Sequence, residues 1–416
     1  MTNRAMKDSG VEWIGAIPED WEILKYKRFA KSGMGSTLLK EDVLISEEPN
    51  SVPVYSATQT DKHFGYLQNP KIVLEKGDLV IPARGNSIGN TKIIKEAIAT
   101  CTQTTIYSKL NNKIDNRFLY YCSIGLKEYW FFFVQTAIPQ ITVAEVQNNL
   151  VPFTSMKEQQ KIAAFLDEKV SHIENIIEDT KKSIENLKAY KQSLITETVT
   201  KGLNPNVDMK DSGIEWAGEI PSHWRVNRLK RIFEIKKDIA NQLGYDILSV
   251  TQKGLKIKDI SSNEGQLSAD YSKYQIVEEN DFVMNHMDLL TGWVDLSKFV
   301  GVTSPDYRVF KSSKPDSINN LFYKYIFQLG YSNKIFYGLG QGVSNKGRWR
   351  LPTDQFLNFE IPIPPIEEQQ AIAIFLNEKT SHVNLLIEQK EQLINELESY
   401  KKSFIYEYVT GKKEVK

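Results

Sequence analysis

The chain has 416 residues, 41% of them hydrophobic and 25% charged, so it is long enough to form several globular domains with buried cores. Lysine and arginine total 52, and aspartate and glutamate also total 52, which removes the argument for DNA binding that a strongly basic chain would give. A neutral chain can still bind DNA, because only the surface that faces the phosphates must be positive.

Membrane and metal-binding classes find no support in the sequence. The longest apolar run, 129–134, is far too short to cross a bilayer, and the N-terminus lacks the apolar core of a signal peptide. Cys101 and Cys122 have no C-x-x-C spacing, and none of the five histidines has the spacing of a metal ligand. We therefore expect a cytoplasmic protein without a membrane partner, a metal site or another cofactor.

The first element in the chain is a segment that returns after its middle. "MKDSGVEWIGAIPEDW" at 6–21 reappears as "MKDSGIEWAGEIPSHW" at 209–224, and we call these two segments repeat A. The tryptophans that recur with it are Trp13, Trp21, Trp216 and Trp224. Because they belong to the repeated part, we expect them to pack in a core rather than to stack on bases.

Each copy of repeat A is followed by more than a hundred residues that differ largely between the copies. Short β-type runs, broken by Gly, Pro, Asn and Asp, alternate there with helical pieces. The only echo between the two segments is "EKGDLVIP" at 75–82 and "EENDFVMN" at 278–285. The pattern predicts two α+β domains with different details.

A second repeat follows each of these segments. "EQQKIAAFLDEKVSHIENIIE" at 158–178 returns as "EQQAIAIFLNEKTSHVNLLIE" at 368–388, and we call these segments repeat B. Ser155 and Glu158 have the spacing of a capping box, while Pro364 and Pro365 with two following glutamates suit a helix start. Repeat B thus predicts the beginnings of two helices.

Apolar residues continue along both helices at alternating steps of three and four. The first stripe is Leu166, Val170, Ile173, Ile177, Thr180, Ile184, Leu187, Lys191 and Leu194, and the second is Leu376, Thr380, Val383, Ile387, Lys390, Ile394, Leu397, Lys401 and Phe404. Helices of about 40 residues are roughly 60 Å long, longer than a small domain is wide, so each needs a long partner. Two separate amphipathic helices lying on globular cores are the alternative.

The whole chain is thus predicted as an α+β protein with a pseudo-twofold internal duplication. Two globular domains are separated by a long antiparallel two-helix coiled coil, and "TKGLNPNVD" at 200–208 links the first helix to the second domain. The predicted parts are a first domain at 1–154, a long helix at 155–200, a linker and second domain at 201–364, and a long C-terminal helix at 365–416.

Polar, glycine-flanked segments in the two domains are candidate DNA-reading loops. Their side chains carry donors and acceptors that match base edges, and their glycines let the backbone approach phosphates. The candidates in the first domain are Arg84, Asn86, Ser87, Gln103, Thr104, Gln135 and Gln140. Those in the second domain are Asn285, His286, Gln341, Asn345, Lys346, Arg348 and Trp349. Ordinary surface loops are the alternative interpretation.

Basic clusters that follow each copy of repeat A are candidate phosphate contacts, although charge runs also occur on solvated faces. They are Lys25, Lys27, Arg28 and Lys31 in the first domain and Arg225, Arg228, Lys230 and Arg231 in the second.

The order of the repeats resembles that of the specificity subunits of type I restriction-modification systems. The motifs that carry the resemblance are "SGVEWIGAIPEDW" and "SGIEWAGEIPSHW", "VPFTSMKEQQKIAAFL" and "IPIPPIEEQQAIAIFL", and "TKGLNP" before the second copy. In that family two target-recognition domains each contact one part of a split, asymmetric DNA sequence. The resemblance implies that the helices also dock two modification subunits and, through them, restriction subunits, so that adenine methylation and restriction are directed to double-stranded DNA.

Catalytic motifs do not support an enzyme. "GVSNKGR" at 342–348 matches a phosphate-binding loop only as far as its second glycine, and neither "NPK" nor "NPN" completes an adenine-methyltransferase motif. We therefore predict no catalytic residues, with the activities in partner subunits. An enzyme with an unrecognised centre and a coiled-coil scaffold that binds something other than DNA are the alternatives.

Overall fold

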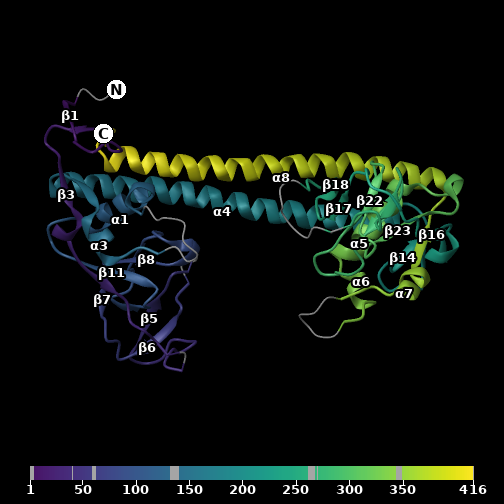
Figure 1. Ribbon diagram of the computed structural model, residues 1–416, viewed down its shortest axis with the longest axis horizontal. Helices are drawn as coiled ribbons and strands as arrows, with labels where there is room; N and C mark the ends of the chain where they lie inside the picture. The colour runs from purple at the N-terminus through teal and green to yellow at the C-terminus, as the bar shows by residue number, and fades with distance from the viewer. Residues whose placement is uncertain are drawn as a thin grey trace. The chain divides into compact units, whose positions relative to one another are not determined.

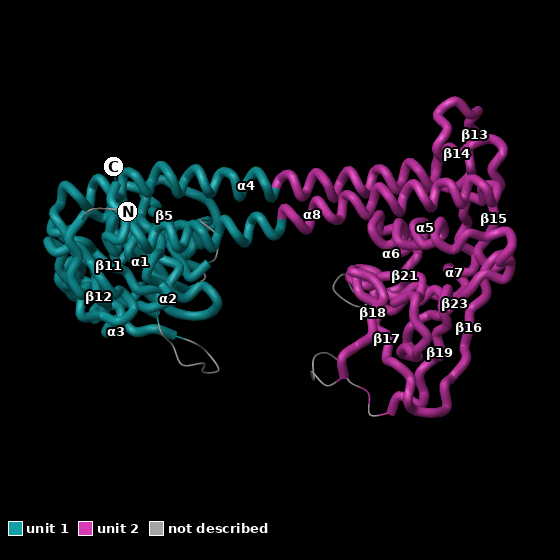
Figure 2. Tube along the Cα trace, turned by 90° about the horizontal axis from the view of Figure 1, so that it is seen from above, with its two compact units in different colours: residues 1–181, 391–416 teal, residues 182–390 magenta. Residues whose placement is uncertain are grey.

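The computed structural model divides the chain into two compact units. Unit 1 combines residues 1–181 with 391–416, and unit 2 comprises 182–390 (Figure 2). No helix in the described part of the chain is long and apolar enough to span a membrane. The residues that the structure describes are 4–39, 41–58, 62–131, 140–260, 268, 270–342 and 349–415.

Two long helices contribute to both units. Helix α4 runs from Met156 to Lys201 and helix α8 from Ile366 to Val409, without interruption. In unit 1 the first part of α4 packs against the last part of α8 (Figure 1). The Lys161 Nζ donates to the Val415 carbonyl oxygen at 2.6 Å, and Lys401 pairs with Glu174 at 3.1 Å. Because the partner's number falls as that of α4 rises, the helices are antiparallel there.

Unit 2 contains the other halves of the same helices, again antiparallel. The Lys191 Nζ donates to the Asn384 Oδ1 at 2.9 Å, while Val199, nearer the end of α4, shares a core with Leu376, nearer the start of α8. The predicted helix pair is therefore confirmed within each unit, and the alternative of two separate amphipathic helices is wrong.

Burial follows the predicted stripe most closely in the first half of each long helix. Leu166 and Leu376 are fully buried, and the stripe residues with less than a tenth of their surface exposed are Leu166, Val170, Ile173, Ile177, Thr180, Ile184, Leu376, Thr380, Val383 and Ile387. Leu187, Leu194, Ile394, Leu397 and Phe404 are only half-buried. Helix α8 ends at Val409, whereas the long C-terminal segment was expected to be helical to the end of the chain.

The strands of unit 1 form two four-stranded sheets and two short pairs. The first sheet has the order β4 (Ala30–Met34), β11 (Thr105–Leu110), β8 (Leu79–Pro82) and β9 (Lys92–Ile93). The second has the order β6 (Gly65–Gln68), β5 (Ser51–Tyr55), β10 (Ile98–Cys101) and β7 (Leu74–Glu75). The pairs are β1 (Met6–Asp8) with β2 (Ala16–Pro18), and β3 (Glu22–Lys25) with β12 (Leu150–Phe153). The shorter helices are α1 (Asn116–Gly125), α2 (Lys127–Trp130) and α3 (Val143–Asn148).

Unit 2 repeats part of this plan. One sheet has the order β16 (Phe233–Lys236), β23 (Arg308–Ser312), β20 (Phe282–Met284) and β21 (Val294–Leu296). Four pairs are β13 (Met209–Asp211) with β14 (Glu219–Pro221), β15 (Arg225–Arg228) with β24 (Glu360–Ile363), β17 (Leu248–Thr251) with β18 (Gly254–Ile257), and β19 (Gln275–Val277) with β22 (Gly301–Thr303). Its helices are α5 (Asn320–Ser332), α6 (Ile335–Gly338) and α7 (Thr353–Asn358). The predicted α+β class and internal duplication are confirmed.

Repeat A and repeat B contact each other within each unit. Trp21 is fully buried and its Nε1 donates to Glu158 Oε2 at 3.1 Å, and the equally buried Trp224 donates to Glu368 Oε2 at 3.0 Å. A buried tryptophan N–H needs an acceptor, and the first glutamate of repeat B supplies it in both copies. The expectation that the repeated tryptophans pack in a core is confirmed for Trp21 and Trp224, while Trp13 and Trp216 are half-buried and pack against the same two cores.

The following glutamine of repeat B joins the long helix to a shorter one. Gln159 Oε1 accepts from the Asp115 backbone N–H at 2.8 Å, and Gln369 Oε1 accepts from the Asn319 backbone N–H at the same distance. Asp115 and Asn319 are the N-caps of α1 and α5, so a fully buried amide fixes both helix starts. The "EQQ" motif is therefore explained by tertiary contacts.

The expected capping box at the start of α4 is only half formed. The Ser155 Oγ accepts from the Glu158 backbone N–H at 3.3 Å. The Glu158 carboxylate instead accepts from Trp21, Arg4 and Thr154. Burial works to raise the pKa of Glu158, but these hydrogen bonds outweigh it and hold the pKa below its usual value.

Candidate nucleic-acid interface

One candidate loop of each unit begins at a matching strand end. Asp78 and Asp281, from the echo between the two domains, each close a turn by accepting a backbone N–H, from Glu75 and Glu278 respectively. Strands β8 and β20 follow these turns at the centre of their sheets. The echoed segment thus forms a turn followed by a central strand. The polar loops at 83–90 and 285–292 follow the ends of these two strands.

In unit 1, three parts of the chain meet beyond the end of β8. The Ala83 N–H donates to the Thr104 carbonyl at 2.9 Å, and the Ile141 N–H donates to the Ala83 carbonyl at 3.0 Å. Arg84 and Gln140 form an antiparallel bridge next to these bonds, with both side chains exposed. The structure therefore brings Arg84, Thr104 and Gln140 together.

Hydroxyl groups cover the neighbouring turn between β10 and β11. The Thr102 Oγ1 lies 2.7 Å from the Thr104 Oγ1 and donates to the Ser56 Oγ at 3.1 Å, and we call these three residues the hydroxyl cluster. Beside it, the Thr37 Oγ1 donates to the exposed Gln103 Oε1 at 2.7 Å. The sequence interpretation placed Thr104 and Gln103, with Thr102 beside them, in a candidate loop but missed Ser56 and Thr37, which the pairing of distant segments places next to that loop.

Two neighbouring candidates of unit 1 differ in exposure. Asn86 is exposed, whereas Ser87 has 2% of its surface exposed and donates its hydroxyl to the Ala57 carbonyl at 2.8 Å. Ser87 therefore holds the loop against Ala57, and Asn86 presents its amide to solvent.

In unit 2, the corresponding junction has a different lining. The Leu351 N–H donates to the His286 carbonyl at 2.9 Å, as Ile141 does to Ala83 in unit 1. Gln341 and Arg350 form a backbone bridge with bonds of 2.8 and 3.0 Å, and both are exposed. The half-buried Asn285 is fixed by its backbone, whose carbonyl accepts from the Tyr331 hydroxyl at 2.7 Å.

Trp349 connects the two sides of this junction. Its carbonyl accepts from the Leu289 N–H at 3.0 Å, and its ring lies 4.7 Å from that of Tyr337. The structure thus brings Asn285, His286, Gln341 and Trp349 together. The other candidates of this unit, Asn345, Lys346 and Arg348, and Gln135 of unit 1, lie outside the described residues.

Positive charge accumulates at this junction of unit 2. Burial, followed by the charges of Arg308 and Arg350, lowers the pKa of His286 to about 3, so its imidazole is neutral at pH 7. Arg308, which the sequence interpretation missed, is 3% exposed, and burial lowers its pKa to about 10. Its only signal in the sequence was a cation at the start of a β-type run, which does not reveal the face of the strand.

The basic clusters after repeat A are partly neutralised within unit 2. Arg228 pairs with Glu360 at 3.3 Å, and the Lys230 Nζ donates to the Asn358 Oδ1 at 2.8 Å. Lys25, Lys27, Arg28 and Lys31 in unit 1, with Arg225 and Arg231 in unit 2, are exposed. Their contact with phosphates remains a prediction.

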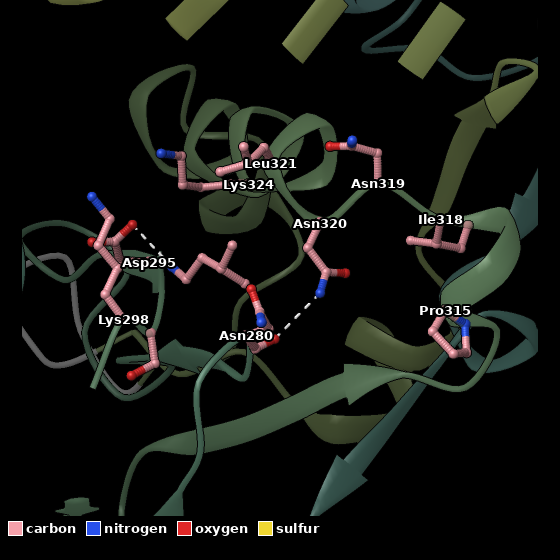
Figure 3. Close-up of a pocket in the computed structure, with 11 residues that line it drawn as sticks. Asn280, Asp295, Lys298, Pro315, Ile318, Asn319, Asn320, Leu321 and Lys324 are labelled. Atoms are coloured by element: carbon pink, nitrogen blue, oxygen red, sulfur yellow. Dashed lines mark hydrogen bonds between the residues drawn. The ribbon is translucent and has the colours of Figure 1, made fainter. Parts of the chain in front are cut away.

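A pocket of about 450 Å³ lies beside α5, away from the candidate residues (Figure 3). Its lining includes Lys298, Lys324 and Asp295, and the Asn320 Nδ2 donates to the Asn280 carbonyl at 3.4 Å across one side. None of the candidate reading residues lines it. In the part of the chain that the structure describes, no group of His, Cys, Asp and Glu is arranged to hold a metal ion.

Comparisons with known proteins agree with this duplicated arrangement. The family model "Type I restriction modification DNA specificity domain" matches residues 18–186 and again 221–399. The type I restriction enzyme MjaVIII specificity subunit of Methanocaldococcus jannaschii is 27% identical over 425 aligned residues, covering 96% of this chain and 94% of the relative. The putative MjaX specificity subunit of the same organism is 24% identical, covering 97% and 96%.

One solved structure shares the fold. It comes from work on complex assembly and conformational transition of the type I R-M system, and it superposes with a TM-score of 0.66 at 14% identity, covering 94% of this chain and 98% of the other.

Proposed function

The chain belongs to the family of type I restriction-modification DNA specificity subunits, and from this premise we propose that each unit reads one half of a bipartite, asymmetric DNA site. Subunits of this kind recognise DNA sequence and leave catalysis to their partners. We infer that this chain works in the cytoplasm, needs no cofactor and directs partner subunits to methylate adenine or cleave double-stranded DNA.

The observation that carries the proposal is the pair of matching junctions with different linings. Exposed Arg84, Gln103 and Gln140 surround the junction of unit 1, and exposed Gln341 and Arg350 that of unit 2. Arginine and glutamine present the donors and acceptors that distinguish base pairs in the major groove. Because the linings differ while the supporting strands match, the two half-sites should differ in sequence.

The long helices have two roles in this proposal. Together α4 and α8 fix the number of unread base pairs between the half-sites, and they dock two modification subunits, which in turn recruit restriction subunits. Ile374 and Leu385 on α8 support the docking role, because they are 70% and 51% exposed and apolar. Insertion of one heptad into both helices should lengthen the unread spacer without changing either half-site.

Mapping methylated adenines tests the proposal directly. Genomic DNA is sequenced from a strain with the chain and its modification subunit, and from the same strain without the chain. We expect methylation at a two-part motif with a constant gap, only when the chain is present. An unchanged methylation pattern would favour the scaffold alternative, and methylation by the purified chain alone would favour the enzyme alternative.

A further inference from the structure

Unsatisfied polar atoms concentrate at the junction of unit 2. Within the described residues, seven buried side-chain nitrogen or oxygen atoms have no hydrogen-bond partner. Three of them are His286 Nδ1, Arg308 Nη1 and Trp349 Nε1, and we call these three residues the donor cluster. The Leu351 N–H donates to the His286 carbonyl, and the Leu351 carbonyl accepts from Arg308. Both residues therefore contact the backbone two positions after Trp349. The three residues therefore belong to one junction, built around residues 349–351.

The contacts of Arg308 leave one arm of its guanidinium without an acceptor. Its Nη2 donates to the Leu351 carbonyl at 3.0 Å and to the Thr353 Oγ1 at 3.3 Å, and its Cζ lies 4.5 Å from the centre of the Phe356 ring. Among the described residues, no carboxylate forms an ion pair with it, and the nearby Arg350 repels it. A guanidinium has five N–H donors in a fixed fork, so at least one arm of the fork is buried without an acceptor.

Unit 1 has no such group at the matching position. Arg308 pairs across the sheet with Met284, and Ile106 pairs with Ile81; Met284 and Ile81 both stand three residues after the turn aspartates Asp281 and Asp78. Arg308 thus takes the place of Ile106, which is fully buried. The fold is stable with an aliphatic residue here, so the buried cation of unit 2 is not required by the sheet.

A buried cation without a counter-charge destabilises the free protein, and a ligand that brings acceptors removes this penalty. The ligand must supply at least two acceptor atoms for the fork and must tolerate a positive surrounding. Arg350 is exposed at the edge of the same junction and adds a second cation toward solvent. A pair of acceptor atoms on an anionic polymer meets both conditions.

We propose that Arg308 is a DNA-contacting residue of unit 2, whose guanidinium arm is buried without a partner in the free protein, becomes accessible as DNA binds at the junction, and then binds a pair of acceptor atoms on DNA. The inference rests on the proposed function and names the group in unit 2 that holds the half-site. Two parts of DNA offer such pairs, the O6 and N7 of guanine and the oxygens of a backbone phosphate. His286 and Trp349 belong to the same junction and each has a side-chain nitrogen without a hydrogen-bond partner.

The test compares the full chain with its Arg308→Met variant, in the presence of the modification subunit. Methionine keeps most of the length of the side chain and removes its charge and donors. We expect the variant to bind the selected duplex roughly tenfold more weakly or worse. Its midpoint of chemical denaturation should stay the same or rise, because an uncompensated cation has left the interior.

A matched control and a second substitution separate the two DNA groups. Lys311→Ala removes an exposed cation from the same strand, where Lys311 pairs with Glu234, and should leave binding unchanged. Arg308→Lys keeps the charge without the fork. If a phosphate is bound, lysine restores much of the affinity for every sequence. If guanine is bound, lysine does not restore it, and selection from a random duplex pool loses its preference at one base pair.

The outcomes distinguish this inference from the proposed function. If the unaltered chain selects no sequence from the pool, the proposed function fails first. If it selects a two-part site and Arg308→Met selects the same site with the same affinity, the inference is overturned while the function stands. An affinity loss equal to that of Lys311→Ala would overturn it as well.

Discussion

Unit 1 and unit 2 bury their repeated tryptophans against equivalent glutamates, Glu158 and Glu368, and start their central strands with equivalent turns, yet they fill the matching strand ends with different chemistry. In unit 1 the turn between β10 and β11 carries the hydroxyl cluster, whose members bond to one another. In unit 2 the donor cluster holds buried nitrogens without partners. The polar groups of the shared contacts are paired within the protein. The residues that differ between the units can therefore be adapted to a ligand.

The largest effect should come from breaking the part that both units share. Trp21→Ala and Trp224→Ala should each lower the free energy of unfolding by roughly 3–5 kcal/mol, because a fully buried indole is replaced by a cavity. Chemical denaturation measures the loss. Trp13→Ala is the control, since Trp13 is only half-buried and stacks on Tyr129, and its loss should be smaller. Clearly unequal losses of unfolding free energy in Trp21→Ala and Trp224→Ala would contradict the conclusion that the two contacts are equivalent.

Transferring the difference from unit 2 to unit 1 should have the next largest effect. Ile106→Arg places a cation at the position of Arg308 without its two acceptors, and should cost roughly 3 kcal/mol of stability. Ile98→Arg, on β10 of the other sheet and 47% exposed, should be nearly neutral. If Ile106→Arg were tolerated as easily as the control, the two sheets would not differ at this position in the way described.

Acidification should weaken unit 2 through His286. Its folded pKa of about 3 lies below the ordinary value of 6.5, so the unfolded chain binds the extra proton first, and stability falls as pH drops below 6.5. Between pH 7 and 5 the loss should approach about 2 kcal/mol, and His286→Gln should remove that part of the slope. His172→Gln, on an exposed position of α4, should keep the slope of the unaltered chain. If His286→Gln kept the same dependence of stability on pH as the unaltered chain, the His286 imidazole would be accessible to protons in the folded protein.

The smallest effect should come from the exposed edge of unit 1. Arg84→Ala should weaken binding to the cognate duplex by about 1 kcal/mol and leave the free energy of unfolding unchanged, because its side chain is exposed. Lys109→Ala, another exposed cation of unit 1 on β11, should change neither. Equal losses in the two variants would reduce the role of Arg84 to unspecific charge.

The repeated half of the structure was predictable because it follows periodic patterns. The apolar steps from Leu166 and Leu376 define the helix faces whatever the tertiary context, and the recurrence of Trp21 as Trp224 identifies a core position. The partners of Glu158 were not predictable in this way. A glutamate at this position can complete a capping box or accept a hydrogen bond from a distant side chain. Only the packing of Trp21 against Glu158 decides between the two roles.

The sequence predicted which loops contribute to the candidate interface but not which of their side chains are exposed. Gln103 and Arg84 are exposed as a polar loop suggests, whereas Ser87 and His286 turn inward at the ends of central strands. Burial at such ends depends on the neighbouring strand, which lies far away in sequence. The same reason hid Arg308, because its position opposite Met284 is set by sheet register and leaves no trace in local composition.

Selection of duplexes by one variant from each unit tests the division of labour most directly. Gln103→Ala in unit 1 and Gln341→Ala in unit 2, each in the full chain with its modification subunit, are incubated with a random duplex pool, and the bound sequences are compared with those of the unaltered chain. The account predicts that each variant loses base preference in one half of the target only, and that the two affected halves are different. Loss of preference at the same positions in both variants, or across both halves in either one, would contradict it.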